Sequence, residues 1–248
     1  MTPLPVVAIT GAGSLERAIA TVLVARGFRV AIYHDEINLP RARNLVHELG
    51  ADRVYTHVIE LEAWETLDAA VEATQATFGA PAHAVLSFDR WEGGGGGPLH
   101  DGGERGERGE RDNGLYARLM EGNTHAVYRA LRMFLRHMVE ARTGSIVVLG
   151  QRMAVRPWEA TGAALYAASH AAGMTLALTA AEEVRAHGVR VNTILLTDHD
   201  GPEARAALPT FDPSRWVSPD AVAKTVAFLV SDEAREITGA TLPMYGRI

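Results

Sequence analysis

The sequence predicts an α/β fold with a doubly wound parallel sheet in a single domain. Short runs rich in β-branched residues alternate with longer segments of helical periodicity, and glycines close several of these segments. Such alternation is typical of right-handed βαβ units, which place parallel strands in one sheet and helices on both of its faces. We therefore expect residues 1–248 to form one unit with about seven parallel strands.

The expected elements follow one another along the chain. Six segments have the composition of buried strands: 6–10, 29–33, 54–59, 82–88, 145–149 and 190–195. Helices are expected between and after them, at 17–26, 41–49, 64–78, 115–142, 166–187 and 219–231.

One segment interrupts this rhythm. Residues 93–111 contain five consecutive glycines and then three Gly-Glu-Arg repeats. With almost no apolar side chains, such a segment cannot offset the entropy lost on ordering, so we expect a flexible insertion. A second interpretation is a mobile lid or partner-binding loop, because the segment follows the fourth strand on the ligand side of such sheets.

Composition excludes several classes of function. The net charge of -6 argues against binding to nucleic acid or to an anionic membrane, since both require basic patches. No apolar run approaches the roughly 20 residues that span a bilayer. The first five residues lack the features of a signal peptide, and the chain has no cysteine, so we expect a cytoplasmic protein. The ten histidines are scattered, and we expect no metal site.

Residues 165–172 read Leu-Tyr-Ala-Ala-Ser-His-Ala-Ala. This run resembles the Tyr-x-x-x-Lys active-site helix of the short-chain dehydrogenase/reductase family, with His170 in the place of the lysine. Segments 144–148, 187–192 and 231–242 also resemble the scaffold of that family. The resemblance implies a Rossmann-like fold and NAD(P)-dependent redox chemistry.

The resemblance also assigns catalytic roles by position. Tyr166 stands where the family has its general acid/base, Asn123 where it has the asparagine of a water relay, and Gln151 where it has a serine that orients the substrate. A permanent cation beside a tyrosine favours the phenolate, whereas histidine, with a reference pKa of about 6.5, is mostly neutral at pH 7. We therefore expect Tyr166, His170, Asn123 and Gln151 to form an impaired catalytic set.

The cofactor loop departs from the family pattern as well. Residues 10–20 retain Gly11 and Gly13, the candidates for contact with a pyrophosphate at a helix N-terminus. The later glycines are replaced by Leu15 and Glu16. A carboxylate 4 Å from a phosphate costs about 4 kcal/mol at an effective dielectric of 20, unless Glu16 turns to solvent and only complements the helix dipole. Asp35, after the second strand, favours NAD over NADP.

Two further cofactor segments are altered. Residues 87–90 read Ser-Phe-Asp-Arg where the family has Asn-Asn-Ala-Gly, and 196–197 read Leu-Thr where it has Pro-Gly. Together with the glycine turn, these changes predict that the chain binds NAD(P) weakly or not at all.

The scaffold, in contrast, predicts association. The helix expected at 166–187 is apolar around most of its circumference, so one face would cover the sheet and another would meet a second subunit. Heteromeric members of the family with one impaired chain exist, and hydroxy(phenyl)methylsuccinyl-CoA dehydrogenase is one that this chain resembles in outline. The leading hypothesis is therefore a non-catalytic subunit that pairs with an active homologue carrying NAD(P), in a heterodimer or heterotetramer that acts on a hydroxyl or carbonyl group, such as that of a hydroxyacyl-CoA.

Two alternatives stay open. The chain could be a self-sufficient, homo-oligomeric oxidoreductase that uses Tyr166, His170 and Asn123. It could instead have left redox chemistry for small-molecule binding or a non-redox reaction. Binding of NAD by the isolated chain would favour the first alternative, and a tight ligand other than a nucleotide would favour the second.

Overall fold

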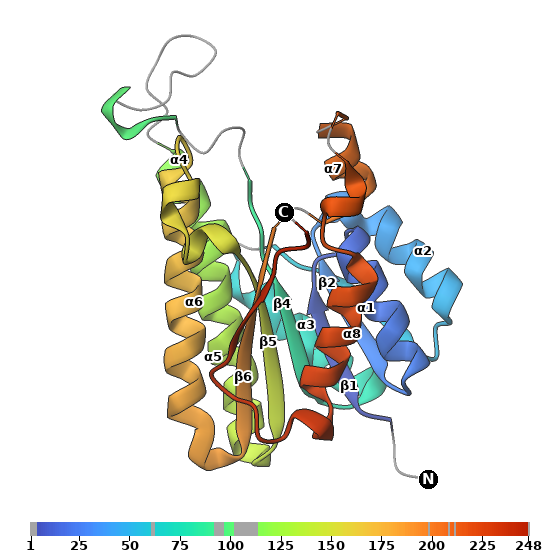
Figure 1. Ribbon diagram of the computed structural model, residues 1–248. Helices are drawn as coiled ribbons and strands as arrows, with labels where there is room; N and C mark the ends of the chain where they lie inside the picture. The colour runs from blue at the N-terminus through green and yellow to red at the C-terminus, as the bar shows by residue number, and fades with distance from the viewer. Residues whose placement is uncertain are drawn as a thin grey trace.

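The computed structural model describes residues 4–60, 63–91, 97–101, 114–197, 199–207, 209–210 and 212–247. These residues build one parallel sheet of seven strands in the order β3-β2-β1-β4-β5-β6-β7 (Figure 1). The strands are β1 (Val6–Thr10), β2 (Arg29–His34), β3 (Val54–Val58), β4 (Pro81–Ser87), β5 (Gly144–Gln151), β6 (Val189–Leu196) and β7 (Thr241–Met244). The predicted fold class is confirmed.

Helices cover both faces of the sheet. One apolar cluster packs α1 (Ser14–Ala25), α2 (Leu39–Leu49) and α8 (Pro219–Val230) against the strands, and these helices lie together on one side in Figure 1. A second cluster packs α3 (Trp64–Phe78), α5 (Ala126–Ala141) and α6 (Ala164–Val184) against the other face. Because side chains on both sides are buried, the central strands are mostly apolar, as parallel strands usually are.

The strand order places a crevice at one edge of the sheet. β1 pairs with β2 on one side and with β4 on the other, so the direction of winding reverses between β1 and β4. At such a switch point the connections leave toward opposite faces and open a space beyond the carboxyl ends of the strands. This edge lies at the top of Figure 1, below α4 (Leu115–Leu119) and α7 (Pro202–Ala207).

One segment that was predicted as a single continuous helix is divided into three parts in the structure. The segment expected as a single helix over 115–142 is α4, then a π-helical turn at Met120–His125, then α5. At this turn Asn123 forms hydrogen bonds with the backbone of Arg90, and Gly122 leaves room for the Arg90 side chain, which would lie 2.8 Å from a Cβ at that position. These long-range contacts lie at the point where the helical pitch changes.

Two smaller differences concern the ends of elements. Helix α1 begins at Ser14, three residues before the predicted start, and α6 passes into a 3-10 turn at Arg185–His187. The predicted 93–111 insertion lies outside the described residues except for 97–101, where Leu99–Asp101 form a short 3-10 turn. No helix among the described residues has both the length and the apolarity to cross a membrane.

Candidate functional site

The site lies at the carboxyl edge of the sheet and begins with the loop after β1. Gly11 has a φ of 93°, a left-handed conformation that glycine adopts without strain, and its N–H donates to the carbonyl oxygen of Tyr33 at 2.7 Å. The chain then reaches Gly13, the residue before α1. This turn points the first N–H groups of α1 into the crevice, as in sites that bind anions.

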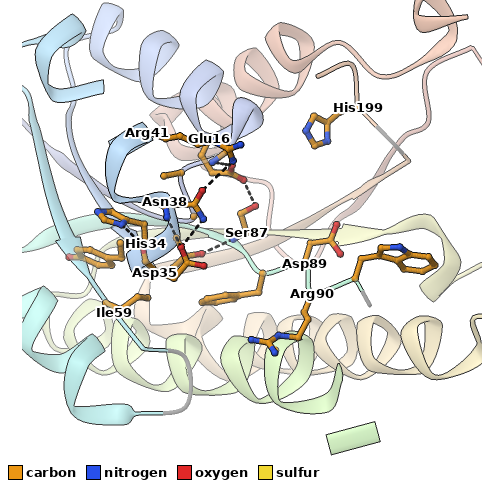
Figure 2. A pocket seen from close by; sticks show the side chains of 18 residues that line it. Glu16, His34, Asp35, Asn38, Arg41, Ile59, Ser87, Asp89, Arg90 and His199 are labelled. Carbon is orange, nitrogen blue, oxygen red and sulfur yellow. Dashed lines mark hydrogen bonds between the residues drawn. The ribbon is translucent and has the colours of Figure 1, made fainter. Parts of the chain in front are cut away.

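The carboxylate of Glu16 occupies this turn. Its Oε2 accepts from the backbone N–H of Gly13 at 2.8 Å, and its Oε1 accepts from the hydroxyl of Ser87 at 2.5 Å (Figure 2). Glu16 is 8% exposed, so it does not point into solvent. A Cβ at Gly11 would lie 3.3 Å from the Glu16 side chain, and one at Gly13 would lie 2.8 Å from Oε2, so the two glycines leave room for this carboxylate.

The position of Glu16 bears on how the phosphates of a dinucleotide could bind at the N-terminus of α1. A pyrophosphate on the first turn of a helix accepts hydrogen bonds from the free N–H groups there. Here the Gly13 N–H donates to Glu16, and Ser87 donates to the same carboxylate. A phosphate entering this turn would meet the negative charge of Glu16 beside a Gly13 N–H that already has an acceptor.

The far end of the crevice is formed by the loop after β2. Asp35 caps a 3-10 turn, where its Oδ1 accepts from the backbone N–H of Asn38 at 3.0 Å and from its Nδ2 at 2.8 Å. Arg41 of α2 donates to the Asn38 Oδ1 at 3.2 Å. The sequence around Asp35 offers no arginine at the strand end, yet α2 brings Arg41 to the same rim (Figure 2).

Between these ends is a cleft of about 450 Å³. It is large enough for a small organic ligand, since such sites usually enclose roughly 300–1,000 Å³. Its walls combine backbone of the glycine turn with charged and aromatic side chains, among them Glu16, Asp35, Arg41, Phe88, Asp89, Arg90, Trp91 and His199.

Asp89 joins three of the predicted catalytic positions. Its Oδ1 accepts from the Tyr166 hydroxyl at 2.6 Å and from the His170 Nε2 at 3.3 Å, and its Oδ2 accepts from the Gln151 Nε2 at 2.8 Å. The rings of Tyr166 and His170 meet edge to face with centroids 4.7 Å apart, because the two residues lie one turn apart on α6. The structure therefore brings Tyr166, His170 and Gln151 together around a carboxylate.

The charge of Asp89 follows from these contacts. Partial removal from water raises the pKa of the Asp89 carboxyl, but the hydrogen bond from His170 and its electrostatic attraction, with the donors Tyr166 and Gln151, outweigh this and lower the pKa below its ordinary value. The side chain is 46% exposed. Asp89 is thus an ionised group at the wall of the cleft, whereas Tyr166 is 4% exposed behind it.

Asn123 lies apart from this group. Its Oδ1 accepts from the Arg90 N–H at 2.7 Å, and its Nδ2 donates to the Arg90 carbonyl at 3.1 Å and to the Ser169 hydroxyl at 3.0 Å. All its polar atoms are thereby used, and the residue is 1% exposed. Asn123 positions the loop that carries Asp89 and Trp91.

Two members of the site, Ser87 and Asp89, stand in the sequence only as departures from a family pattern. Ser87 ends β4 and Asp89 follows it by two residues, so both lie at the ligand edge of the sheet. That position was the available signal. Within the described part of the chain, no three His, Asp or Glu side chains gather in a way that would hold a metal ion.

Comparisons with known proteins show what the sequence of this chain is similar to. The family model described as short chain dehydrogenase matches residues 5–207. The 3-oxoacyl-[acyl-carrier-protein] reductase FabG of Salmonella typhimurium is 28% identical over 254 residues, which cover 96% of this chain and 94% of FabG. Protein FixR of Bradyrhizobium diazoefficiens is 39% identical over 113 residues, which cover 44% of this chain and only 40% of FixR.

The fold comparison agrees as well. A short-chain type dehydrogenase/reductase from Mycobacterium ulcerans superposes with a TM-score of 0.85 at 23% identity, over 100% of this chain and 90% of that one. At this identity the likeness establishes the fold alone.

Proposed function

We propose that this chain, which belongs to the short-chain dehydrogenase family, is the non-catalytic subunit of a hetero-oligomer whose active subunit is a homologous dehydrogenase. In this proposal the partner binds NAD(P) and transfers hydride to or from a carbonyl or hydroxyl substrate. The chain described here supplies scaffold and contact surface. The observation that carries the proposal is the Glu16 carboxylate in the phosphate turn.

Glu16 argues against a resident dinucleotide for two reasons. It uses the donor that a phosphate would use, and it places a negative charge where the two negative charges of a pyrophosphate would lie. Displacing it would break its hydrogen bonds to Gly13 and Ser87 and would leave a carboxylate inside the crevice. A charge-assisted bond of this kind is roughly twice as strong as a neutral one.

The catalytic tyrosine position supports the same conclusion. The Tyr166 hydroxyl donates to Asp89, and the Gln151 amide does so as well, so neither donor is directed at a substrate carbonyl. The charge of Asp89 also opposes a second negative charge on the phenol oxygen. Hydride transfer to a carbonyl needs a proton donor at the carbonyl oxygen, and here that donor is engaged.

The outer surface of α6 supports association. Residues 162–181 contain no Asp, Glu, Lys or Arg. Ala164, Ala168, Ala171, Thr175 and Leu178 recur at a spacing of three or four residues, and none of them is fully buried in the single chain. An uncharged stripe of this length on a helix surface is typical of a face that packs against another subunit.

The relatives support a class of substrate. FabG is by its name a reductase of 3-oxoacyl groups, and its similarity extends over nearly the whole chain. We therefore place the reaction of the complex at a carbonyl or hydroxyl group, with hydroxyacyl and oxoacyl compounds as the leading candidates. The open cleft beside Asp89 favours a second candidate function, the binding of a small molecule by this chain itself.

The test has two arms. Calorimetric titration of the isolated chain with NADH and NADPH should give no binding in the micromolar range, and micromolar binding of either nucleotide would overturn the proposal. Co-expression with the homologous dehydrogenase encoded nearest to it should give a stable complex with dehydrogenase activity. In that complex Tyr166→Phe should leave the activity in place, and phenylalanine at the matching tyrosine of the partner should abolish it.

A further inference from the structure

At Asp89 the wall of the cleft presents hydrogen-bond acceptors, whereas a site for a carbonyl substrate presents donors. A carbonyl oxygen needs donors, and the donors at this point are Tyr166 and Gln151. Both already donate to Asp89, at 2.6 and 2.8 Å. Asp89 lies between them and the cleft, so the group that a ligand meets is the carboxylate.

The carboxylate has room for one more donor. A carboxylate offers about four lone-pair sites, and an ionised one can only accept. Among the described residues, Oδ1 accepts from Tyr166 and His170, whereas Oδ2 accepts from Gln151. The Asp89 side chain is 46% exposed and lines the cleft, so a ligand donor in the cleft can approach its carboxylate.

The nearby arginine does not cancel this charge within the cleft. Figure 2 shows the guanidinium of Arg90 and the carboxylate of Asp89 extending to opposite sides of their loop. The Arg90 side chain packs over Gly122, where it would lie 2.8 Å from a Cβ. The whole lining of the cleft has three carboxylates, Glu16, Asp35 and Asp89, and two guanidinium groups, Arg41 and Arg90, so its carboxylates outnumber its arginines. A cation entering here is therefore attracted, and a carboxylate is repelled.

An aromatic surface adjoins the carboxylate. Trp91 lines the cleft, is 51% exposed, and packs edge-on against the Tyr166 ring with centroids 4.8 Å apart. Because Tyr166 fixes one edge of the indole, much of its surface stays open to a ligand. Aromatic faces attract both apolar groups and cations. Phe88, next to Asp89, extends the apolar wall.

We propose that the cleft binds a small organic cation at Asp89, a primary amine or an amidine with an apolar or aromatic body that lies on Trp91. The N–H groups of the cation donate to Oδ2, and the body covers the exposed indole. This binding does not depend on a partner subunit or on a dinucleotide, so it stands or falls separately from the proposed function.

The experiment uses four probes of similar shape on the isolated chain: benzamidine, benzylamine, benzyl alcohol and benzoate. Titrations followed by two-dimensional NMR should show saturable binding of benzamidine and benzylamine, at least tenfold weaker binding of benzyl alcohol, and none of benzoate. Equal binding of the neutral or anionic probes, or no saturable binding of the cations, would overturn the inference.

Four variants test whether the binding depends on Asp89 and Trp91. Asp89→Asn should weaken benzamidine binding at least tenfold, whereas Asp220→Asn, which removes the same charge from an exposed site on α8, should not change it. Tyr166→Phe removes one donor to Asp89 and leaves its charge, so this variant should bind benzamidine at least as tightly as the wild type. If Asp89→Asn fails to fold, Tyr166→Phe and Trp91→Leu decide: unchanged affinity in Trp91→Leu, or loss of binding in Tyr166→Phe, would contradict the proposal.

Discussion

The Oε2 of Glu16 lies 2.8 Å from the backbone nitrogen of Gly13, so the anion at the first turn of α1 comes from the chain itself. The bond is one half of a capping box: a glutamate at the third helical position accepts from the N–H of the residue before the helix, and Gly13 has no side chain to accept a bond in return. The same carboxylate accepts from Ser87 at the end of β4. It thereby connects the start of α1, which follows β1, to β4, the neighbouring strand at the switch point.

Removing this carboxylate should open the phosphate turn. Glu16→Ala frees the Gly13 N–H and removes a negative charge, so we expect NADH to bind at least tenfold more tightly than to the wild type, a change of about 1.4 kcal/mol. Lost capping should cost about 1 kcal/mol of stability. Calorimetric titration and urea unfolding measure the two effects. Glu48→Ala, an exposed partner of Arg17, is the matched control and should leave affinity unchanged; an unchanged affinity in Glu16→Ala would show that Glu16 does not exclude the nucleotide.

Asn123 should matter for stability. Asn123→Leu removes three hydrogen bonds, to the N–H and carbonyl of Arg90 and to Ser169, at a site 1% exposed. Leaving buried polar groups unpaired costs about 1–3 kcal/mol each when no water replaces the bond, so we expect a loss of roughly 2–4 kcal/mol. Urea unfolding followed by circular dichroism measures it. His125→Ala, at an exposed position two residues on, should cost less than about 0.5 kcal/mol, and equal losses in both variants would contradict the assignment.

His83 should make the protein sensitive to mild acid. Burial in β4, with a smaller contribution from the charge of Arg190, lowers the pKa of His83 from 6.5 to about 4, and its Nδ1 lies 2.8 Å from the Ser145 hydroxyl oxygen. Between these two values the unfolded chain binds a proton that the folded chain does not. The free energy of unfolding should therefore fall as pH drops from 6.5 to 4, by up to about 1.4 kcal/mol per pH unit from this residue.

Chemical unfolding at pH 7 and pH 4.5 tests this contribution. His83→Asn, which can keep a hydrogen bond to Ser145, should lose less stability between the two pH values than the wild type does. His47→Gln, at an exposed position on α2, should behave like the wild type. Identical pH dependence in all three proteins would show that His83 does not titrate as described.

The outer stripe of α6 should control assembly. Ala168→Arg and Thr175→Arg each place a long cation on the uncharged face, and both positions are exposed in the single chain. We expect the complex with the partner, or the homo-oligomer, to dissociate, because an unpaired charge buried in an interface costs several kcal/mol. Analytical ultracentrifugation measures the mass. Thr21→Arg on the exposed face of α1 should have no effect, and an unchanged mass in both α6 variants would place the interface elsewhere.

The fold could be predicted because its signals are local. β-branched runs and helical periodicity locate strands and helices within two or three residues, as for the strand expected at 190–195 and found at Val189–Leu196. The π-helical turn at Met120–His125 could not be predicted in this way, since it coincides with a contact between Asn123 and Arg90 across 33 positions, which local patterns do not show.

The site was predicted in part. Spacing alone places Tyr166 and His170 on one face of α6, and the rings do meet. The role of Asp89 could not be predicted from the sequence, because a charged residue in a loop usually points to solvent. Its hydrogen bond to Tyr166 spans 77 positions. The sequence predicts that Glu16 opposes phosphate binding. It does not predict that the Glu16 side chain points into the crevice, because the hydrogen bond from Ser87 forms only in the folded sheet.

The Glu16 carboxylate at the first turn of α1 has a consequence for the lifetime of the protein in the cell. A protein stabilised by a bound ligand gains RT ln(1 + [L]/Kd), so its resistance to proteolysis rises and falls with the supply of that ligand. In this chain Glu16 accepts from the Gly13 N–H at the turn where a nucleotide phosphate would bind. If the chain binds no nucleotide, as we propose, its resistance to proteolysis and its abundance should not depend on the cellular nucleotide pool.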